Sequence, residues 1–320
     1  MTNLTVRTDL TRFLDKAALT LVKGKTTNTK RAYLLHWDQF RDWWQGHPGE
    51  SMLDTLLDYV EYMVDVQDFA PRTIGSKLAA VKGVFRTAAA LNPDLSRYLP
   101  QMDLVRGPTV SGAIQGQRLD PKQTRALLNA PGTETPKGIR DTAILSSMAI
   151  MAMRRSELCM LTWGHLQTLD GYPVIANLKS KHGHVRTIKL PDWLSDLFQL
   201  WRVDLTEARQ RVLEDDERVF IPIAKGGRIV VEAESMTPQA IYKLVSHPGY
   251  GYVAKCGLPS IKPHDLRRTA ALLARRGGAS IEQVQILLGH ASPHTTSNYI
   301  GEVLDLTDHA IDYIPVRPGG

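Results

Sequence analysis

The apolar residues of the first hundred positions recur three or four apart, a spacing that places their side chains on one face of an α-helix. Stripes of this kind predict helices at about residues 10–21, 29–46, 52–63 and 71–86. The second stripe is aromatic and consists of Tyr33, Trp37, Phe40 and Trp44. In the third stripe, Leu57 and its neighbouring leucines are expected to face the core. We therefore expect residues 1–103 to form a small all-helical domain with the aromatic stripe in its core.

The helical pattern stops between residues 104 and 117, where glycine and proline recur without periodicity, as is typical of a linker. A second domain, residues 118–320, mixes helical stripes with two short β-branched runs at 174–176 and 185–190. Its helices are expected at about residues 121–130, 138–153, 193–212, 238–245, 265–276 and 281–288, followed by an amphipathic tail. The predicted fold is mainly α with a small β-sheet, in which a helical domain precedes an α+β domain.

Composition narrows the class of protein. No apolar run reaches the roughly 20 residues of a membrane span, and the N-terminus lacks the pattern of a secretory signal. We therefore expect a cytoplasmic protein without a membrane partner. The two cysteines, Cys159 and Cys256, lack metal-ligand spacing and suit a reducing compartment. The net charge of +6 and the pI of about 9.2 permit a nucleic-acid partner without requiring one.

Basic residues outside the apolar stripes have two interpretations. They form solvated helix faces, the usual role of such charges, or they contact the phosphates of DNA. The candidates for DNA contact lie on the predicted helices and in the linker: Lys30, Arg31, Arg72, Lys77, Lys82, Arg86 and Arg106.

A short C-terminal stretch gathers four chemically active side chains. His264 and Arg267 are three residues apart near the start of a predicted helix, so they share a face at the end that favours anions. His290 follows a helix-ending glycine, and Tyr299 comes nine residues later. Such a group is suited to binding a phosphate.

Two basic residues from elsewhere complete this candidate site. Arg154 ends the almost wholly apolar helix predicted at 138–153, and Lys181 lies in the hairpin between the two predicted strands. Two arginines and two histidines can stabilise the oxygens of a transferring phosphoryl group without magnesium. We therefore expect no metal and no other cofactor.

These residues and their spacing resemble the signature of the tyrosine recombinases, the phage-integrase family. The C-terminal part is His264-x-x-Arg267, Leu288-Gly289-His290 and the run from Thr295 to Tyr299. Residues 153–158 resemble the family's first arginine motif, with Ala152 where glycine is common. Lys181 matches the hairpin lysine, although Lys179 is a close competitor. Residues 29–44 resemble the family's core-binding domain, so the resemblance covers almost the whole chain.

The resemblance implies a DNA-cleaving mechanism and an assembly. Tyr299 would be the nucleophile, forming a 3′-phosphotyrosyl link and releasing a 5′-hydroxyl. Arg154, Arg267 and His290 would stabilise the scissile phosphate. The partner would be a double-stranded DNA recombination site, bound by a homotetramer that passes through a Holliday junction and dissociates to monomers in free solution. The two domains would clamp the duplex.

The remaining implied roles concern protons and orientation. Lys181 would protonate the leaving oxygen, and His264 would assist proton transfer at the tyrosine. Glu157 would either orient the cluster or form a structural salt bridge. The tail after Tyr299 would dock on its own domain or on a neighbouring protomer.

Two rival functions remain open on the sequence. One is a type IB-like topoisomerase or hairpin resolvase, which would use the same chemistry on one duplex. The other is a catalytically inactive DNA-binding protein of the same fold. The resemblance favours a site-specific recombinase encoded by a prokaryote, phage or plasmid.

Overall fold

The computed structural model describes residues 2–47, 51–108, 117–179, 185–289 and 296. It divides into two compact units, Met1–Gly112 and Ala113–Gly320. The division falls inside the segment 104–117 that the sequence predicts as a linker, while the functional roles assigned to the two domains stay predictions. Each unit is described by itself.

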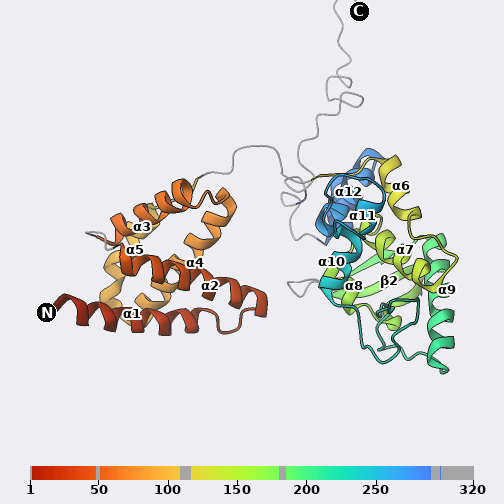
Figure 1. The fold of residues 1–320 in the computed structure, drawn as a ribbon, viewed down its shortest axis with the longest axis horizontal. Coiled ribbons are helices and arrows are strands. Elements are labelled where there is room, and N and C mark those ends of the chain that lie inside the picture. Colours follow the sequence, from red (N-terminus) through yellow and green to blue (C-terminus); the bar gives the residue numbers. More distant parts are fainter. Residues whose placement is uncertain (1, 48–50, 109–116, 180–184, 290–295, 297–320) are drawn as a thin grey trace, which may run out of the picture. The chain divides into compact units, whose positions relative to one another are not determined.

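Among its described residues, the N-terminal unit contains helices and no strand (Figure 1). Helix α4 packs against both α1 and α2. The elements are α1 (Thr2–Leu21), α2 (Thr27–Gly46), α3 (Met52–Glu61), the π-helical turn η1 (Tyr62–Val66), α4 (Pro71–Leu91), the 3-10 turn η2 (Pro93–Tyr98) and α5 (Leu99–Leu104). Helix α1 begins eight residues before the start that its apolar stripe predicts, because the first two turns carry few of the apolar residues on which that prediction depended.

Aromatic residues form the centre of this unit, as the stripe predicted. Trp37, Phe40 and Trp44 are buried, and the indole of Trp37 donates a hydrogen bond of 2.7 Å to Asp15 in α1. The expectation that Leu57 faces inward is wrong, since it is 48% exposed. Tyr59 takes the inward position instead, with its ring edge-on to Phe40 at 5.0 Å.

The C-terminal unit places a small antiparallel sheet beside helices (Figure 1). The described strands are β1 (Leu166–Leu169), β2 (Tyr172–Lys179) and β3 (Val185–Lys189), hydrogen-bonded in that order. The described helices are α6 (Pro121–Asn129), α7 (Pro136–Ala149), α8 (Arg155–Met160), the 3-10 turn η3 (Trp163–His165), α9 (Asp192–Arg209), α10 (Pro238–Ser246), α11 (Tyr252–Lys255), α12 (Pro263–Arg276) and α13 (Ile281–Leu288). Helix α7 is buried and contacts α6, α9 and α12.

Helix α7 ends four residues earlier than the sequence predicts. The apolar run continues to Met153, yet the helix stops at Ala149 and the chain turns at Ala152, which has a left-handed φ of 54°. Burial of this turn explains the error, because buried turn residues are as apolar as a buried helix. The turn delivers Arg154 to the start of α8.

Strand β2 contains a bulge that sets its register with β3. Ile175 pairs with Ile188, whereas the next pair joins Leu178 to Arg186, so β2 carries one extra residue. Asn177, in this interval, has a left-handed φ of 55°. Such a bulge increases local twist and changes which side chains share a face.

Across the described residues, no helix combines the length and apolar character that crossing a bilayer requires.

Candidate active site

Arg154 is held at the start of α8 by one carboxylate. Its guanidinium Nη1 donates to Glu157 Oε1 at 2.7 Å, and its backbone N–H donates to Glu157 Oε2 at 2.7 Å. Glu157 is 4% exposed, whereas the Arg154 side chain keeps 27% of its surface. Glu157 therefore fixes the direction of the arginine, while part of the Arg154 side chain stays accessible to a phosphate.

Arg186 on β3 reaches the same carboxylate, a contact that sequence reasoning missed. Its Nη2 donates to Glu157 Oε2 at 2.8 Å, and its Nη1 donates to the carbonyl of Leu287 at 2.7 Å. Burial lowers the pKa of Arg186, an effect that Glu157 opposes and the nearby charge of Arg154 reinforces. The alternation of β3, in which Arg186 shares its buried face with Ile188, was the signal available in the sequence.

Arg267 lies on α12 and is only 1% exposed. Its Nη1 donates to the carbonyl of Ala152 and its Nη2 to the carbonyl of Leu288. The first carbonyl lies two residues before Arg154, and the second lies two residues before His290. One guanidinium thus joins the α7–α8 turn to the end of α13, bringing together segments that the sequence placed in one site.

His264 lies one turn before Arg267 on α12 and is exposed. Its pKa is lowered, first by desolvation and then by the positive charges of Arg268, Arg267 and Arg154. The influence of Arg154 and Arg267 on one imidazole places the three residues in a single electrostatic neighbourhood. The lowered pKa favours the neutral imidazole of His264, the form that accepts a proton.

We expect the His264 ring in the free protein to titrate below its ordinary pKa of 6.5, with Arg268→Gln shifting the midpoint upward. The folded state binds this proton less tightly than the unfolded state, so protonating His264 as the pH falls below 6.5 lowers stability. Histidine NMR signals followed across pH test this, with His264→Gln providing the assignment. A midpoint above 6.5 would contradict the electrostatic description.

Gly289 ends α13 with a left-handed φ of 60°, directly against Arg186. A Cβ at this position would meet Arg186 Cδ at 2.9 Å and Nη1 at 3.1 Å. Gly257 has the same φ of 60°, yet its Cβ would meet nothing within 4 Å. Comparing alanine substitutions at the two glycines therefore separates the cost of a left-handed alanine from the cost of the contact with Arg186.

Gly257→Ala is expected to lower the free energy of unfolding by about 1 kcal/mol, the cost of left-handed alanine. Gly289→Ala should lose roughly a further 1–3 kcal/mol, because Arg186 cannot move aside without breaking its two hydrogen bonds. Urea denaturation of both variants measures the difference. Equal losses would mean that Arg186 yields freely.

Three predicted catalytic residues, Lys181, His290 and Tyr299, lie outside the described residues, and their roles stay predictions. Lys179, the competitor of Lys181, lies at the exposed end of β2, where it pairs with Val185 of β3. No group of three or more His, Cys, Asp or Glu that could hold a metal ion occurs among the residues that the structure describes.

The predicted DNA contacts in the N-terminal unit differ in exposure. Lys30, Arg31 and Arg72 are exposed. The surface position predicted for Lys77 is wrong: it is 4% exposed, its ammonium donates to Gln39, and it lies over the Phe69 ring at 4.6 Å. The long aliphatic stem of lysine allows it to occupy an inward position while its ammonium reaches these partners.

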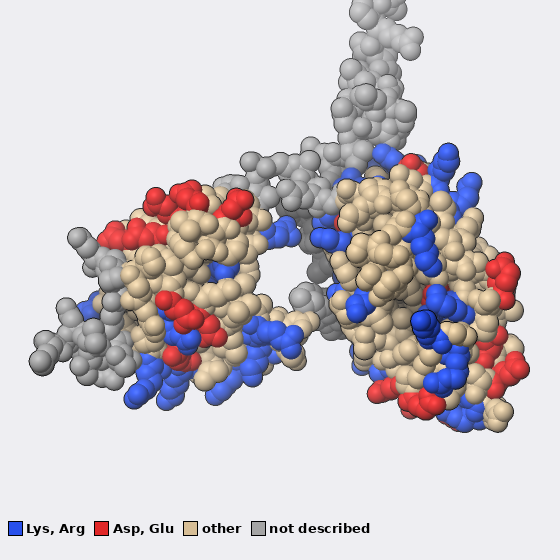
Figure 2. Space-filling model, viewed as in Figure 1, with Lys and Arg blue, Asp and Glu red and all other residues tan. Residues whose placement is uncertain are grey.

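The other three candidates line one surface hollow of about 630 Å³. Lys82 donates to the carbonyl of Val105 at 2.5 Å, and Arg86 pairs with Asp103 at 2.6 Å. Arg106 is exposed, and Lys25 lies on the same hollow. Figure 2 shows basic side chains gathered in groups on each unit, some of them next to acidic ones.

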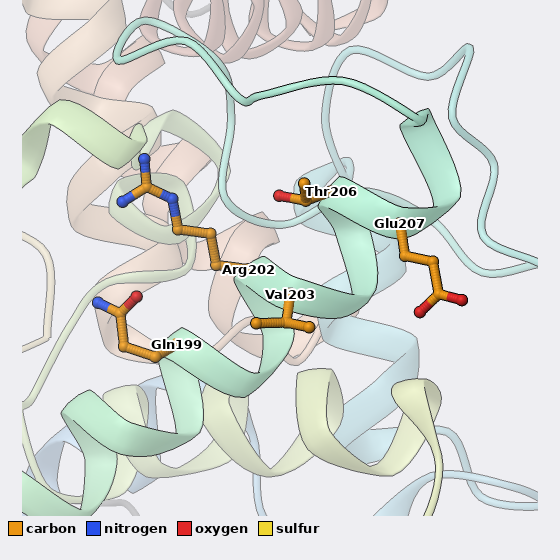
Figure 3. A pocket seen from close by; sticks show the side chains of 5 residues that line it. All are labelled: Gln199, Arg202, Val203, Thr206 and Glu207. Carbon is orange, nitrogen blue, oxygen red and sulfur yellow. The ribbon is translucent and has the colours of Figure 1, made fainter.

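A second hollow, of about 360 Å³, lies along α9 (Figure 3). Its lining side chains all come from that helix: Gln199, Arg202, Val203, Thr206 and Glu207. It contains none of the predicted catalytic residues, so the arginine cluster remains the candidate site.

Comparison with known proteins agrees with the fold and the sequence signature. Tyrosine recombinase XerD of Pseudomonas aeruginosa is 30% identical over 301 residues, covering 90% of this chain and 90% of the relative. Tyrosine recombinase XerC of Corynebacterium efficiens is 26% identical over 310 residues, covering 81% and 92%. A model described as the phage integrase family matches residues 117–303.

Solved structures share the fold. XerH site-specific recombinase bound to its difH substrate aligns with a TM-score of 0.64 and 16% identity, over 90% of both chains. The Tn1549 transposon integrase in complex with transposon right end DNA aligns with a TM-score of 0.64 and 18% identity, over 91% of this chain and 95% of the other. The predicted fold class is confirmed.

Sequence relatives, fold and arginine cluster together define a tyrosine site-specific recombinase, an enzyme of DNA recombination. The chain belongs to the phage integrase family, whose model spans more than half of its length.

Proposed function

We propose that this recombinase cleaves one strand of its DNA site by attack of the Tyr299 hydroxyl oxygen on the scissile phosphorus. A bond forms between that oxygen and phosphorus, and the bond from phosphorus to the 5′ oxygen breaks. The products are a 3′-phosphotyrosyl link and a free 5′-hydroxyl. Rejoining reverses these bonds with a 5′-hydroxyl from another strand, so the phosphodiester energy is kept and no cofactor is required.

The observation that carries this proposal is the meeting of Arg154 and Arg267 at one place. The α7–α8 turn supplies the first and α12 the second, and Arg267 is bonded to the backbone of the segment that carries Arg154. Two fixed guanidinium groups suit the two non-bridging oxygens of a phosphate in a pentacoordinate transition state. His290 adds a further donor to those oxygens.

Proton transfer in this scheme uses His264 and Lys181. His264, whose lowered pKa favours its neutral form, receives the proton of the Tyr299 hydroxyl. Lys181 gives a proton to the departing 5′ oxygen, and Lys179 is the alternative donor. Glu157 contributes by holding Arg154.

The proposed partner is double-stranded DNA carrying a recombination site, contacted by both units. Among the N-terminal candidates we retain the exposed Lys30, Arg31, Arg72, Arg86 and Arg106 together with Lys82, and leave out the buried Lys77. Exchange between two sites requires two protomers on each, so we propose a homotetramer on DNA that forms a Holliday junction from monomers in free solution.

The experiment begins with selection of the target from a random duplex library. A suicide substrate with a nick near the cleavage position then loses its short 5′-hydroxyl fragment, which traps the covalent protein–DNA adduct. No adduct on the selected site would leave the inactive DNA-binding protein as the function. A circular DNA with two copies of the site then separates strand exchange from simple relaxation, the outcome expected of a topoisomerase.

A further inference from the structure

Arg186 is a buried cation with no part in the scheme above. Its side chain keeps 6% of its surface and lies on the inward face of β3. It donates one hydrogen bond to Glu157 on α8 and one to the carbonyl of Leu287 on α13. Three elements far apart in the sequence therefore meet at a single guanidinium.

The contact continues from Arg186 to Arg154 through Glu157. One oxygen of this carboxylate accepts from the Arg154 guanidinium, and the other accepts from Arg186 and from the Arg154 backbone N–H. A carboxylate held at both oxygens has little freedom to rotate. The direction of the Arg154 guanidinium therefore depends on where Arg186 holds Glu157.

The second contact of Arg186 reaches the end of α13. Leu287 and Leu288 are consecutive at the end of α13, and their carbonyls accept from Arg186 and Arg267 respectively. The chain leaves this point as Gly289 and His290. Arg186 thus fixes the helix end from which His290 follows as well as the carboxylate behind Arg154.

We propose that Arg186 is a positioning residue for strand cleavage, which holds Arg154 through Glu157 and the end of α13 through Leu287. The inference rests on the proposed function and adds to it a residue that touches neither DNA nor nucleophile. A planar guanidinium, with donors fixed in a fork, joins two acceptors at set directions, which a single ammonium does not. An intact buried ion pair is often no more stabilising than apolar residues of similar volume, so orientation is the better account of a charge at this depth.

Arg140 is a buried arginine outside the candidate site, and it provides a matched control for Arg186. It is 4% exposed, donates to the carboxylate of Asp141 at 2.6 Å and donates to the carbonyl of Ile221 at 2.9 Å. Its burial and partners match those of Arg186, but Asp141 contacts Lys137 and Tyr252 in place of a catalytic arginine. Loss of Arg186 removes one hydrogen bond from Glu157 and one from the part-buried carbonyl of Leu287. Loss of Arg140 removes two from Asp141 and one from the buried carbonyl of Ile221.

The experiment compares Arg186→Met with Arg140→Met in the full chain. Both variants should lose about 10 °C in Tm, because each breaks a buried pair. Covalent capture is then followed in a single turnover below both melting temperatures, with all DNA bound. Arg186→Met should be slower by about 10–100-fold, as expected for a misplaced catalytic group, while Arg140→Met should retain the wild-type rate. Equal rates for the two variants would overturn the proposal.

A DNA substrate whose scissile linkage is uncharged supplies a readout that the stability of the protein does not affect. When a methyl group replaces one non-bridging oxygen of the scissile phosphate, the arginines have less charge to stabilise. The ratio of wild-type to Arg186→Met rates should then shrink about tenfold if Arg186 acts through Arg154. An unchanged ratio would assign Arg186 to folding alone. If the wild-type protein itself forms no adduct, the proposed function fails, a different result from equal rates in an active enzyme.

Arg186→Lys keeps the positive charge, and it is the variant to measure if Arg186→Met does not fold. Its single ammonium can reach Glu157 or Leu287 but cannot hold both in the planar arrangement. Cleavage should recover only in part, remaining roughly 3–10-fold below wild type. A full wild-type rate in Arg186→Lys would show that the fork is not needed and would contradict the inference.

Discussion

Phenylalanine in place of Tyr299 should abolish covalent capture of DNA and leave DNA affinity within about threefold of wild type. The substitution removes one oxygen atom, the nucleophile itself, and no other side chain in the scheme can form the same phosphodiester. Binding depends on contacts with the phosphates along the duplex, which the missing hydroxyl does not alter. A denaturing gel of labelled suicide substrate measures capture, and a gel shift at fixed salt measures affinity.

A second tyrosine controls for generic effects of removing a phenol. Tyr172 is 56% exposed at the start of β2, with the Lys189 ammonium 4.4 Å from its ring centre. Tyr172→Phe should capture DNA at the wild-type rate. An adduct that persists in Tyr299→Phe would move the nucleophile to another residue and refute the central assignment.

Methionine in place of Arg267 should slow cleavage by about 10³-fold and also lower the free energy of unfolding by about 2–4 kcal/mol. The two effects share one cause, since the same guanidinium is proposed to hold the phosphate and already donates to two buried backbone carbonyls. Without it, the carbonyls of Ala152 and Leu288 each lose a donor in a region closed to water. Single-turnover capture and urea denaturation measure the two losses.

Arg154→Met separates the two effects. Its guanidinium is partly exposed and donates to Glu157, which keeps Arg186 as a partner. The rate should fall by about 10²–10³-fold, with a much smaller loss of stability than in Arg267→Met. Arg140→Met gives the opposite control, a loss of stability at a normal rate. Equal stability losses in the two site variants would contradict the structural role of Arg267.

The helices that carry the site were predictable because local signals agree with their packing. Ser280 caps α13, which runs from Ile281 to Leu288 as the apolar spacing predicts. The grouping of Arg267 with Arg154 depended on their shared chemistry and on the family signature, since no local rule brings residues so far apart in sequence together.

The errors have physical causes as well. Lys77 follows the charge rule for a surface lysine, yet Gln39 and the Phe69 ring offer its ammonium partners inside the fold. Strand β1 has four residues and no strong pattern of its own, so its structure depends on pairing with β2. Arg186 was missed because the sequence does not reveal that its buried face opposes a glutamate.

The bulge in β2 decides which side chain of β2 stands opposite Arg186. Directly opposed residues of an antiparallel pair share a face, and Leu178 stands opposite Arg186 only because β2 carries one extra residue. In a regular ladder continued from Ile175, Asn177 would take that place and offer its amide oxygen to the guanidinium. An aliphatic neighbour offers no such acceptor, which favours a single bonding arrangement of Arg186 over an exchange between two.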